Sequence, residues 1–440
     1  RQAMRELVNQ AGENDNISTI YVIDDEEKFY GAIELQKLIV AREHEDLEDI
    51  ISRSYPYVLD HEKISDCIEK IKDYAEDSIP VLLEDGTIAG IITAQDIVEV
   101  VDDEMAHTGT FTGSDETLNQ VLRNAFWGIR SNYKGMPVDC PQRNERQPWL
   151  GDHAMGSWGE SLFFNNHALY NKWTRDIREA QREDGCIPDV APAYWNYYSD
   201  NVTWPATLPL VCDMLFTNYG DRRAIEENYP ALKKWVSHIR EYYLNREFII
   251  TKDKYGDWCV PPESLEMIHS NDPARKTDGA LIATAYYLKV LQLMHRFASI
   301  QGLTADAKEW EDLEHKMKDA FNARFLHAKE GTSLVPGHTL YPDSIFYGNN
   351  TVTANILPLA FGLVPKNYIN EVAKNAVTSI ITTNKGHIST GVIGVQWLLR
   401  ELSRRGHANV AYLLATNKTY PSWGYMVEKG ATTIWELWNG

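Results

Sequence analysis

The chain changes character near residue 106, and this change limits it to two parts that fold separately. Up to residue 106 there are 9 Lys and Arg against 27 Asp and Glu, whereas residues 107–440 carry 34 against 36. All 13 tryptophans lie in the second part, the first of them at Trp127. We therefore predict an acidic domain at residues 1–106 and an aromatic-rich domain at residues 107–440.

The acidic part contains one pattern twice. The first copy has the strand-like run STIYVID, the polar turn DEEK, a second run FYGAIEL and the helical stretch QKLIVAREHEDLEDIIS. The second copy, IPVLLEDGTIAGIITAQDIVEVV, repeats strand, turn, strand and helix, with Asp85-Gly86 suited to a tight hairpin turn. A period of roughly 60 residues indicates a tandem α/β repeat.

This repeat resembles a pair of CBS domains, in particular the cytosolic pair of MgtE-type magnesium channels. In the CBS family, a Thr-x-x-Asp after the second hairpin strand can hold an adenosine ribose. The second copy has Thr93 and Asp96 at these places, whereas the first copy departs from the pattern with Glu34 and Lys37. The resemblance therefore implies an adenine-nucleotide site at Thr93 and Asp96, and the departure argues against a paired site.

The acidic runs at residues 24–27 and 102–104 offer a second ligand for this part. Asp24 and Asp25 carry oxygen ligands of the kind that Mg²⁺ takes, and a magnesium-sensing role would use them. A solvated acidic face is the alternative interpretation. The resemblance to CBS pairs also implies a homodimer through this domain.

Helical periodicity dominates the second part. From Leu118 to Ile129, apolar residues recur at helical spacing, with Ser114 and Asp115 placed to cap the start. Further stripes lie near residues 158–183, 205–218, 280–300, 366–381, 391–405 and 407–416. About ten helices with few strand signals predict a mainly α fold, in which paired helices close into an (α/α)6 barrel. Periodicity alone also allows a solenoid.

The segment DCPQRNERQPWLGD, residues 139–152, is too rich in charge to be an amphipathic helix. It places Asp139, Glu145 and Asp152 close together in the chain, with Arg143 and Arg146 on either side of the glutamate. These charges must converge on a pocket or pair with one another. A structural network of arginines and carboxylates is the alternative to a catalytic site.

The segment resembles the signature of the α-L-rhamnosidases of glycoside hydrolase family 78. The resemblance extends from about Gly109 to Gly440 and includes AQREDGCIPDVAPAYW, YSDNVTWPATLP, YGDWCVPPES, YGNNTVTANILPLAFGLVP and TYPSWGYMVEKGATTIWELWNG. It implies a six-hairpin glycosidase in which Glu145 is the general acid and Glu436, in TTIWELW, the general base. The family inverts configuration, so we expect roughly 6.5–9.5 Å between the two carboxyl groups.

The same resemblance implies the residues that bind the sugar. Ionised carboxylates would accept hydrogen bonds from rhamnose hydroxyls, and aromatic rings would face its C–H side and its methyl group. The implied binding residues are Asp139, Asp152, Trp149, Tyr198, Asp200, Trp204 and Trp258. No metal is expected in the barrel and no cofactor in catalysis, because HExxH, Walker and GxGxxG motifs are absent.

Composition and motifs also exclude some roles. An overall pI near 5.1 without a basic stripe argues against a nucleic-acid partner. No apolar run reaches the ~18–20 residues of a membrane span. The CBS-like segment favours the cytoplasm, and a periplasmic location would require a leader before Arg1. The isolated cysteines are expected to be buried reduced thiols.

The sequence thus predicts an inverting exo-α-L-rhamnosidase that acts on rhamnose-containing glycosides or plant polysaccharides. Two alternatives stay open: a Mg²⁺- or adenylate-sensing module with a catalytically silent barrel, or a barrel glycosidase that acts on another sugar. In the family the chain continues beyond WELWNG, so we expect the barrel domain to be truncated at Gly440.

Overall fold

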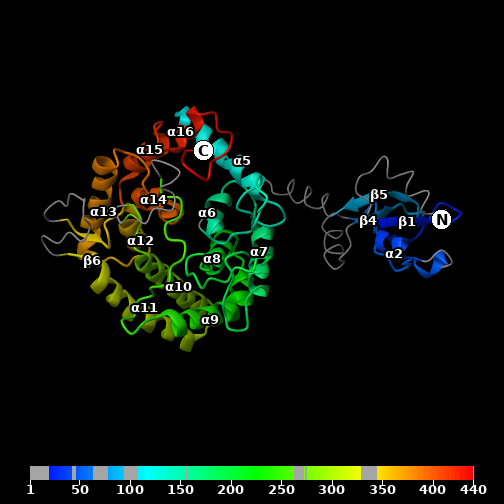
Figure 1. Cartoon of the computed structure of the whole chain (residues 1–440), viewed down its shortest axis with the longest axis horizontal. Helices are drawn as coiled ribbons and strands as arrows, with labels where there is room; N and C mark the ends of the chain where they lie inside the picture. The colour runs from blue at the N-terminus through cyan, green and yellow to red at the C-terminus, as the bar shows by residue number, and fades with distance from the viewer. Residues whose placement is uncertain are drawn as a thin grey trace. The chain divides into compact units, whose positions relative to one another are not determined.

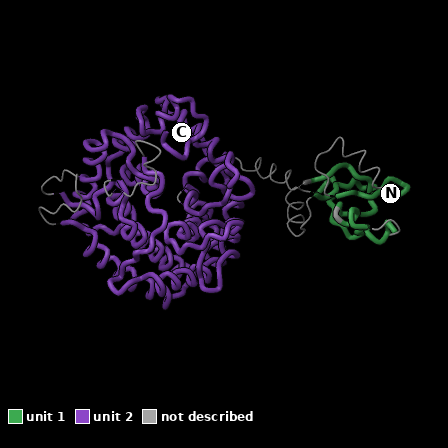
Figure 2. Tube along the Cα trace, viewed as in Figure 1, with its two compact units in different colours: residues 1–104 green, residues 105–440 purple. Residues whose placement is uncertain are grey.

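A computed structural model of the chain describes residues 19–41, 46–62, 78–93, 107–154, 156–261, 272, 275–328 and 344–439. The chain divides into two compact units, Arg1–Glu104 and Met105–Gly440, which Figure 2 colours separately. Among the described residues, no helix is both long enough and apolar enough to cross a membrane.

The first unit contains the predicted pair of hairpins. Strand β1 (Thr19–Ile23) is antiparallel to β2 (Phe29–Glu34), and β4 (Ser78–Leu82) is antiparallel to β5 (Ile88–Thr93). A short strand β3 (Val58–Leu59) pairs in parallel with β4. The two hairpins match residue for residue, because Glu34 pairs with Thr19 as Thr93 pairs with Ser78.

The helical stretch after β2 is shorter than the sequence predicts. Helix α2 (Leu35–Val40) ends where Ala41 adopts an extended conformation, and only a single 3-10 turn, η1 (Leu47–Asp49), follows within the described residues. Glu34 and Lys37, which replace the nucleotide-binding pattern in this copy, form an ion pair of 2.6 Å. Their charges therefore satisfy each other at the start of the helix.

The second unit is built from helices arranged in a ring (Figure 1). The described helices are α5 (Glu116–Asn132), α6 (Gly156–Glu160), α7 (His167–Glu179), α8 (Thr207–Tyr219), α9 (Arg223–Tyr243), α10 (Gly279–Gln301), α11 (Thr304–Phe325), α12 (Val352–Ala360), α13 (Ile369–Thr378), α14 (Val392–Arg404), α15 (Ala408–Thr416) and α16 (Trp423–Glu428). Strands β6 (Leu326–His327) and β7 (Phe346–Tyr347) form one short antiparallel pair.

Helices α8, α10, α12 and α14 lie on the inside of the ring, and α9, α11, α13 and α15 lie outside them (Figure 1). The sequence explains this order. Helices α8, α10 and α12 are apolar on nearly all sides and almost wholly buried, whereas α11 buries a single stripe that includes Trp310, Met317 and Phe321. The predicted cap Asp115 accepts a hydrogen bond from Leu118 N at 2.9 Å.

The first and last helices of the unit meet, so the ring is closed. Helix α5 contacts both α15 and α16, and Asn124 Nδ2 donates to Ala431 O at 2.8 Å. This closure separates the barrel from a solenoid and confirms the predicted fold. The apolar stripe predicted at residues 158–183 corresponds to two helices, α6 and α7, because the helical conformation is interrupted between them. Asn166, in this interruption, accepts a hydrogen bond from the Tyr219 hydroxyl through its side chain.

Candidate active site

The charged segment 139–152 forms a loop that is closed by its own hydrogen bonds. Asp139 N donates to Gln147 O at 2.9 Å, and Gln147 N donates back to Asp139 Oδ1 at 2.8 Å. Gln147 Nε2 also donates to the main-chain carbonyl of Glu145 at 2.7 Å. Because these bonds fix both ends of the loop, Glu145 stands at its tip with its side chain 24% exposed.

The two predicted catalytic glutamates share one arginine. Arg143 Nη1 lies 3.1 Å from Glu145 Oε1, and the Nη2 of the same guanidinium contacts Glu436 Oε2. A guanidinium is a small planar group, so both carboxylates lie within one hydrogen bond of its two ends. The structure thus brings together two residues that are nearly three hundred positions apart in the sequence.

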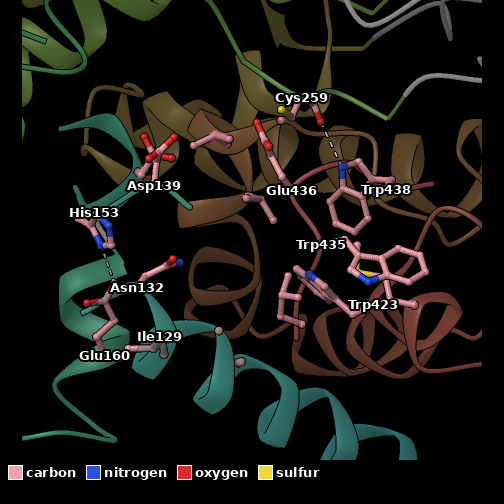
Figure 3. A pocket seen from close by; sticks show the side chains of 18 of the residues that line it. Ile129, Asn132, Asp139, His153, Glu160, Cys259, Trp423, Trp435, Glu436 and Trp438 are labelled. Atoms are coloured by element: carbon pink, nitrogen blue, oxygen red, sulfur yellow. Dashed lines mark hydrogen bonds and ion pairs between the residues drawn. The ribbon is translucent and has the colours of Figure 1, made fainter. Parts of the chain in front are cut away.

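Glu436 borders a cavity of about 370 Å³, which we call the carboxylate pocket because Asp139, Asp152 and Glu160 also line it. Much of the remaining wall is apolar, and Figure 3 shows Trp423, Trp435 and Trp438 gathered together on one side. Asp139, His153 and Glu160 lie on the other side, with Glu436 between the two groups (Figure 3). A few polar groups that converge within apolar walls are typical of a small-molecule site.

Under the pocket lies a buried hydrogen-bond network centred on Glu160. Its Oε2 accepts bonds of 2.5 Å from the hydroxyls of Tyr133 and Tyr170, and its Oε1 lies 3.1 Å from His153 Nδ1. His153 Nε2 lies 3.1 Å from the carbonyl of Val138. Since a carbonyl can only accept, and the ionised carboxylate accepts as well, both ring nitrogens of His153 carry a proton.

Electrostatics agree with a charged His153–Glu160 pair. Burial alone would raise the pKa of Glu160, but the charge of His153 and the hydrogen bonds from His153, Tyr133 and Tyr170 outweigh it, and this pKa is lowered. Burial alone would likewise lower the pKa of His153, but the neighbouring Glu160 raises it. An imidazolium therefore lies next to Asp152, in the short turn η2 (Gly151–His153).

The two aspartates of the pocket are harder to ionise than ordinary aspartates. Burial raises the pKa of Asp139, and the negative charge of Glu145 adds to the effect. The depth of the pocket raises the pKa of Asp152 to about 6, although the charge of His153 opposes the rise. The Asp152 side chain is nevertheless exposed to the open space of the pocket, where a ligand could reach it.

The predicted aromatic wall is placed by ring contacts. Trp149 stacks on Tyr197 with ring centroids 5.5 Å apart, and Trp204 packs against Tyr255 at 4.4 Å. Trp204 also lies directly against Gly151, where a Cβ would come within 2.3 Å of its ring. Contact with the turn that carries Asp152 therefore requires glycine at this position.

Three other predicted binding residues are hydrogen-bonded to helices, Trp258 through its main chain and the other two through their side chains. The carbonyl of Trp258 accepts a bond of 2.7 Å from Val392 N at the start of α14. Tyr198 donates to Ala180 O at 2.6 Å, at the end of α7. Asp200 accepts bonds of 2.8 and 2.5 Å from His238 and Tyr243 of α9. Of the predicted residues, Asp139, Asp152 and Glu436 line the carboxylate pocket; the others are not among its described lining residues, namely Glu145, Trp149, Tyr198, Asp200, Trp204 and Trp258.

A buried aspartate fixes the loop that borders the pocket. Asp257 accepts hydrogen bonds from the main-chain N–H groups of Gly391, Ile393 and Gly394 at 2.9 to 3.0 Å, and from Thr353 Oγ1 at 2.5 Å. These N–H groups belong to the first turn of α14, which has no other acceptors within its own helix. The loop residues next to Asp257 are therefore held on the helix.

Sequence reasoning missed several of these groups. Glu160, Tyr133, Tyr170, Trp423 and Asp257 were not predicted to belong to the site. Trp423 lies in TYPSWGYMVE, one of the segments that carry the family resemblance, and this could have pointed to it. Glu160, Tyr133 and Tyr170 lie outside the quoted motifs, so no signal in the sequence pointed to them.

Two side-chain groups have the composition of metal ligands. Cys186, Asp200 and His238 place three potential ligand atoms within 4.8 Å of one another, and so do Asp139, Cys140 and Glu145. Their atoms already have protein partners: Asp200 accepts from Tyr243 and His238, and Glu145 pairs with Arg143. The four described cysteines are buried free thiols, as expected: Cys140, Cys186, Cys212 and Cys259.

In the first unit, the predicted Mg²⁺ ligands lie in the β1–β2 turn. Asp24 Oδ1 accepts bonds of 2.9 Å from the main-chain N–H groups of Glu26 and Lys28, and Asp25 is exposed. Thr93 ends β5, but its side chain lies outside the described residues, as does the whole of Asp96.

Comparison with known proteins gives a separate match for each part of the chain. The model of the CBS domain matches residues 47–103. The magnesium transporter MgtE of Enterococcus faecalis is 36% identical over 106 residues, which cover 24% of this chain and 23% of that protein. The N-terminal part is therefore a CBS region similar to that of the transporter.

The barrel matches α-L-rhamnosidases. An α-L-rhamnosidase of Formosa agariphila is 31% identical over 334 residues, 75% of this chain and 33% of that protein. The structure of the α-L-rhamnosidase from "Dictyoglumus thermophilum" is 33% identical, with a TM-score of 0.68, and covers 80% of this chain and 36% of its own. The Streptomyces avermitilis enzyme complexed with L-rhamnose is 29% identical, with a TM-score of 0.67, and covers 79% and 30%.

The chain spans about a third of the length of these relatives. The family model described as the bacterial α-L-rhamnosidase six-hairpin glycosidase domain matches residues 106–440, which is most of the chain. Together with the closed ring of helices, this match shows that the chain belongs to the bacterial α-L-rhamnosidase six-hairpin glycosidase family.

Proposed function

We propose that the chain is an exo-acting, inverting α-L-rhamnosidase that hydrolyses terminal α-L-rhamnose from glycosides or polysaccharides. The observation that carries the proposal is the shared contact of Glu145 and Glu436 with Arg143, together with the position of Glu436 in the wall of the carboxylate pocket. Two carboxylates held on either side of one small group can act on the same glycosidic bond from opposite sides. Membership of the α-L-rhamnosidase family supports the choice of sugar.

In the proposed reaction, Glu145 gives its proton to the glycosidic oxygen while the bond from that oxygen to the anomeric carbon breaks. Glu436 takes a proton from a water molecule, whose oxygen forms the new bond to the anomeric carbon from the opposite face. The product is rhamnose of inverted configuration and an aglycone with a free hydroxyl. Arg143, whose side chain is 45% exposed, must leave the space between the carboxylates when the sugar enters.

The remaining groups would hold the sugar. Asp139 and Asp152 would accept hydrogen bonds from rhamnose hydroxyls, and the tryptophans of the pocket would pack on its C–H face and methyl group. Trp149, Trp204 and Trp258 are proposed as the wall on the side of segment 139–152. Tyr198 and Asp200 would act indirectly, through the loop that they anchor to α7 and α9.

The test is hydrolysis of an aryl α-L-rhamnoside by the full chain and by Glu145→Gln and Glu436→Gln. Each variant should lose about 10²- to 10⁴-fold in kcat, the usual worth of a general acid or base. The matched control is Glu428→Gln, an exposed glutamate of α16 paired with Lys418, which should retain wild-type turnover. Wild-type rates in both test variants would refute the assignment.

Two further measurements sharpen the proposal. Proton NMR of the first product should show β-L-rhamnose before mutarotation, whereas α-L-rhamnose would exclude inversion. Aryl glycosides of another deoxyhexose and of a glucuronic acid, compared under the same conditions, should be turned over far more slowly. A preference for either one would reassign the sugar.

For the N-terminal unit, the likeness to the magnesium transporter supports a second proposal, binding of Mg²⁺ or of an adenine nucleotide. Asp24 and Asp25 would serve the cation, and Thr93 and Asp96 the nucleotide, without any part in hydrolysis. Calorimetric titration of the full chain with MgCl₂ and with ATP tests this directly. Heats no larger than those of dilution would reject it.

A further inference from the structure

A second cavity, of about 390 Å³, lies beside the carboxylate pocket. We call it the cationic pocket. Its described lining consists of residues 260–261, Arg275, residues 383–385 and 387–389, and residues 420–421. None of the described lining residues is an aspartate or glutamate, whereas four carboxylates line the neighbouring pocket.

Three stretches of chain lead from one pocket to the other. Cys259 lines the first and Val260 the second; Gly391 lines the first and Ser389 the second; Trp423 lines the first and Pro421 the second. Consecutive Cα atoms lie about 3.8 Å apart and Cα atoms two residues apart at most about 7 Å, so Cα atoms of the two linings come within about 7 Å of each other. Cys259 and Trp423 can be found at the border of the first pocket in Figure 3. This spacing suits two adjacent sugar units.

The cationic pocket contains buried donors for which the described residues supply no acceptor. One terminal nitrogen of Arg275, Nη2, donates to Pro261 O, but the other, Nη1, is buried and has no hydrogen-bond partner among the described residues. Within the same part of the chain, Ser389 Oγ is buried without a partner as well. A buried donor without an acceptor destabilises the folded protein until a partner satisfies it. A ligand with acceptor oxygens would supply that partner.

The other charges point the same way. Lys385 lines the pocket on a tight turn, with φ at 51°, and its side chain is exposed. His387 Nδ1 lies 3.0 Å from Asn384 O, and its Nε2 lies 2.8 Å from Thr419 Oγ1, so both ring nitrogens already have protein partners. The pocket therefore presents two permanent positive charges, a guanidinium and an ammonium.

We propose that the cationic pocket binds a negatively charged group on the sugar to which the rhamnose is attached, either a uronic acid carboxylate or a sulfate ester. Arg275 Nη1 and Ser389 Oγ donate to its oxygens, and Lys385 adds a charge at the entrance. The inference rests on the proposed rhamnosidase activity and adds the substrate class: rhamnosides of anionic sugars rather than of neutral ones.

The experiment compares disaccharides that differ only in charge. α-L-Rhamnosyl-(1→4)-D-glucuronic acid is assayed beside α-L-rhamnosyl-(1→4)-D-glucose and the 6-sulfate of the latter. For the full chain, kcat/KM should be at least about tenfold higher for an anionic substrate, the usual worth of a charge-assisted hydrogen bond. The carboxylate and sulfate arms show which anion is preferred.

Substitution then assigns the preference to residues. Arg275→Gln should lower the ratio of anionic to neutral kcat/KM by about tenfold, and Lys385→Gln, at an exposed position that folding does not depend on, by about two- to threefold. The matched control is Arg222→Gln, an exposed arginine of the barrel paired with Glu226, which should keep the wild-type ratio. Thermal unfolding confirms that each variant is folded.

The outcomes separate this inference from the proposed function. Equal turnover of charged and neutral disaccharides, or a wild-type ratio in both Arg275→Gln and Lys385→Gln, would overturn the inference while the rhamnosidase assignment stands. If no rhamnoside is cleaved, the proposed function fails, and calorimetry with sodium glucuronate against glucose decides the pocket. Binding of glucuronate alone supports an anion site, and absence of binding rejects it.

Discussion

Two groups of glutamates are held in opposite ways: the rim, by which we mean Glu436 of the pocket wall with Glu145 on the shared Arg143, and the floor, by which we mean Glu160. At the rim, Glu145 and Glu436 are 24% and 47% exposed and share the exposed Arg143. At the floor, Glu160 is 7% exposed and bound by His153, Tyr133 and Tyr170. An exposed carboxylate can exchange partners at little cost, whereas a buried one cannot. The rim is therefore suited to proton transfer, and the floor to keeping the geometry fixed.

The largest expected effect on stability is at the floor. Glu160→Gln should lower the free energy of unfolding by about 3–5 kcal/mol, because it leaves the His153 imidazolium buried without its counterion. Chemical denaturation followed by tryptophan fluorescence measures this loss, since every tryptophan lies in the barrel part. The control, Glu436→Gln, should change the free energy by less than about 0.5 kcal/mol. Equal losses in the two variants would contradict the contrast between rim and floor.

Asp152 lies between the two regions, and its pKa near 6 should be visible in catalysis. In the proposed function its ionised form would accept hydrogen bonds from the sugar, so kcat/KM on an aryl α-L-rhamnoside should fall as the pH drops below about 6. Asp152→Asn should lower kcat/KM about tenfold at pH 7 and flatten this acid limb.

Asp139→Asn gives a second test of the decrease in kcat/KM at acid pH, which we call the acid limb. Removing the negative charge of Asp139 should lower the pKa of Asp152 and shift the limb to lower pH without abolishing it. A limb that stays in place in both variants would mean that another group controls it.

The charged floor pair also predicts how stability depends on pH. The pKa of Glu160 is lowered, so its contribution is lost as the pH falls below about 4.3. The pKa of His153 is raised, so its contribution is complete below about 6.5 and is lost as the pH rises through the folded-state value. From pH 6.5 to 9, the free energy of unfolding should therefore decline more steeply in the wild type than in His153→Gln. Parallel curves would show that His153 is neutral.

The smallest expected effect is at the rim. Arg143→Gln removes the ion pairs of an exposed arginine with Glu145 and Glu436, so the free energy of unfolding should change by less than about 1 kcal/mol. The same denaturation measurement checks it. A loss as large as that of Glu160→Gln would show that the rim is as rigid as the floor.

The barrel could be predicted because its amphipathic helices give apolar residues at helical spacing in the sequence. The two glutamates of the rim, Glu145 and Glu436, could be predicted because they lie in motifs that resemble those of a known family. The floor could not be predicted in this way. Glu160 lies in GSWGESLFF. Its partner Tyr133 comes from the end of α5 and its partner Tyr170 from α7, at distances along the chain that carry no periodic signal.

Asp200 shows the opposite difficulty. Asp200 lies in the motif YSDNVTWPATLP, close in the sequence to other residues predicted to bind the sugar. In the structure its carboxylate is instead bound by His238 and Tyr243, which lie 38 and 43 residues further along the chain. Side-chain hydrogen bonds between distant segments decide which way such a residue faces, and one sequence does not reveal them.

The anchoring of Asp257 to the first turn of α14 has a practical consequence for redesign. The loop positions on either side of this anchor, residues 260–261 and 388–389, border the cationic pocket but make none of the four bonds that hold Asp257. They can therefore be exchanged in redesign without removing that anchor. Under the proposed function, substitutions confined to these positions would alter the choice of aglycone and leave the carboxylate pocket as it is.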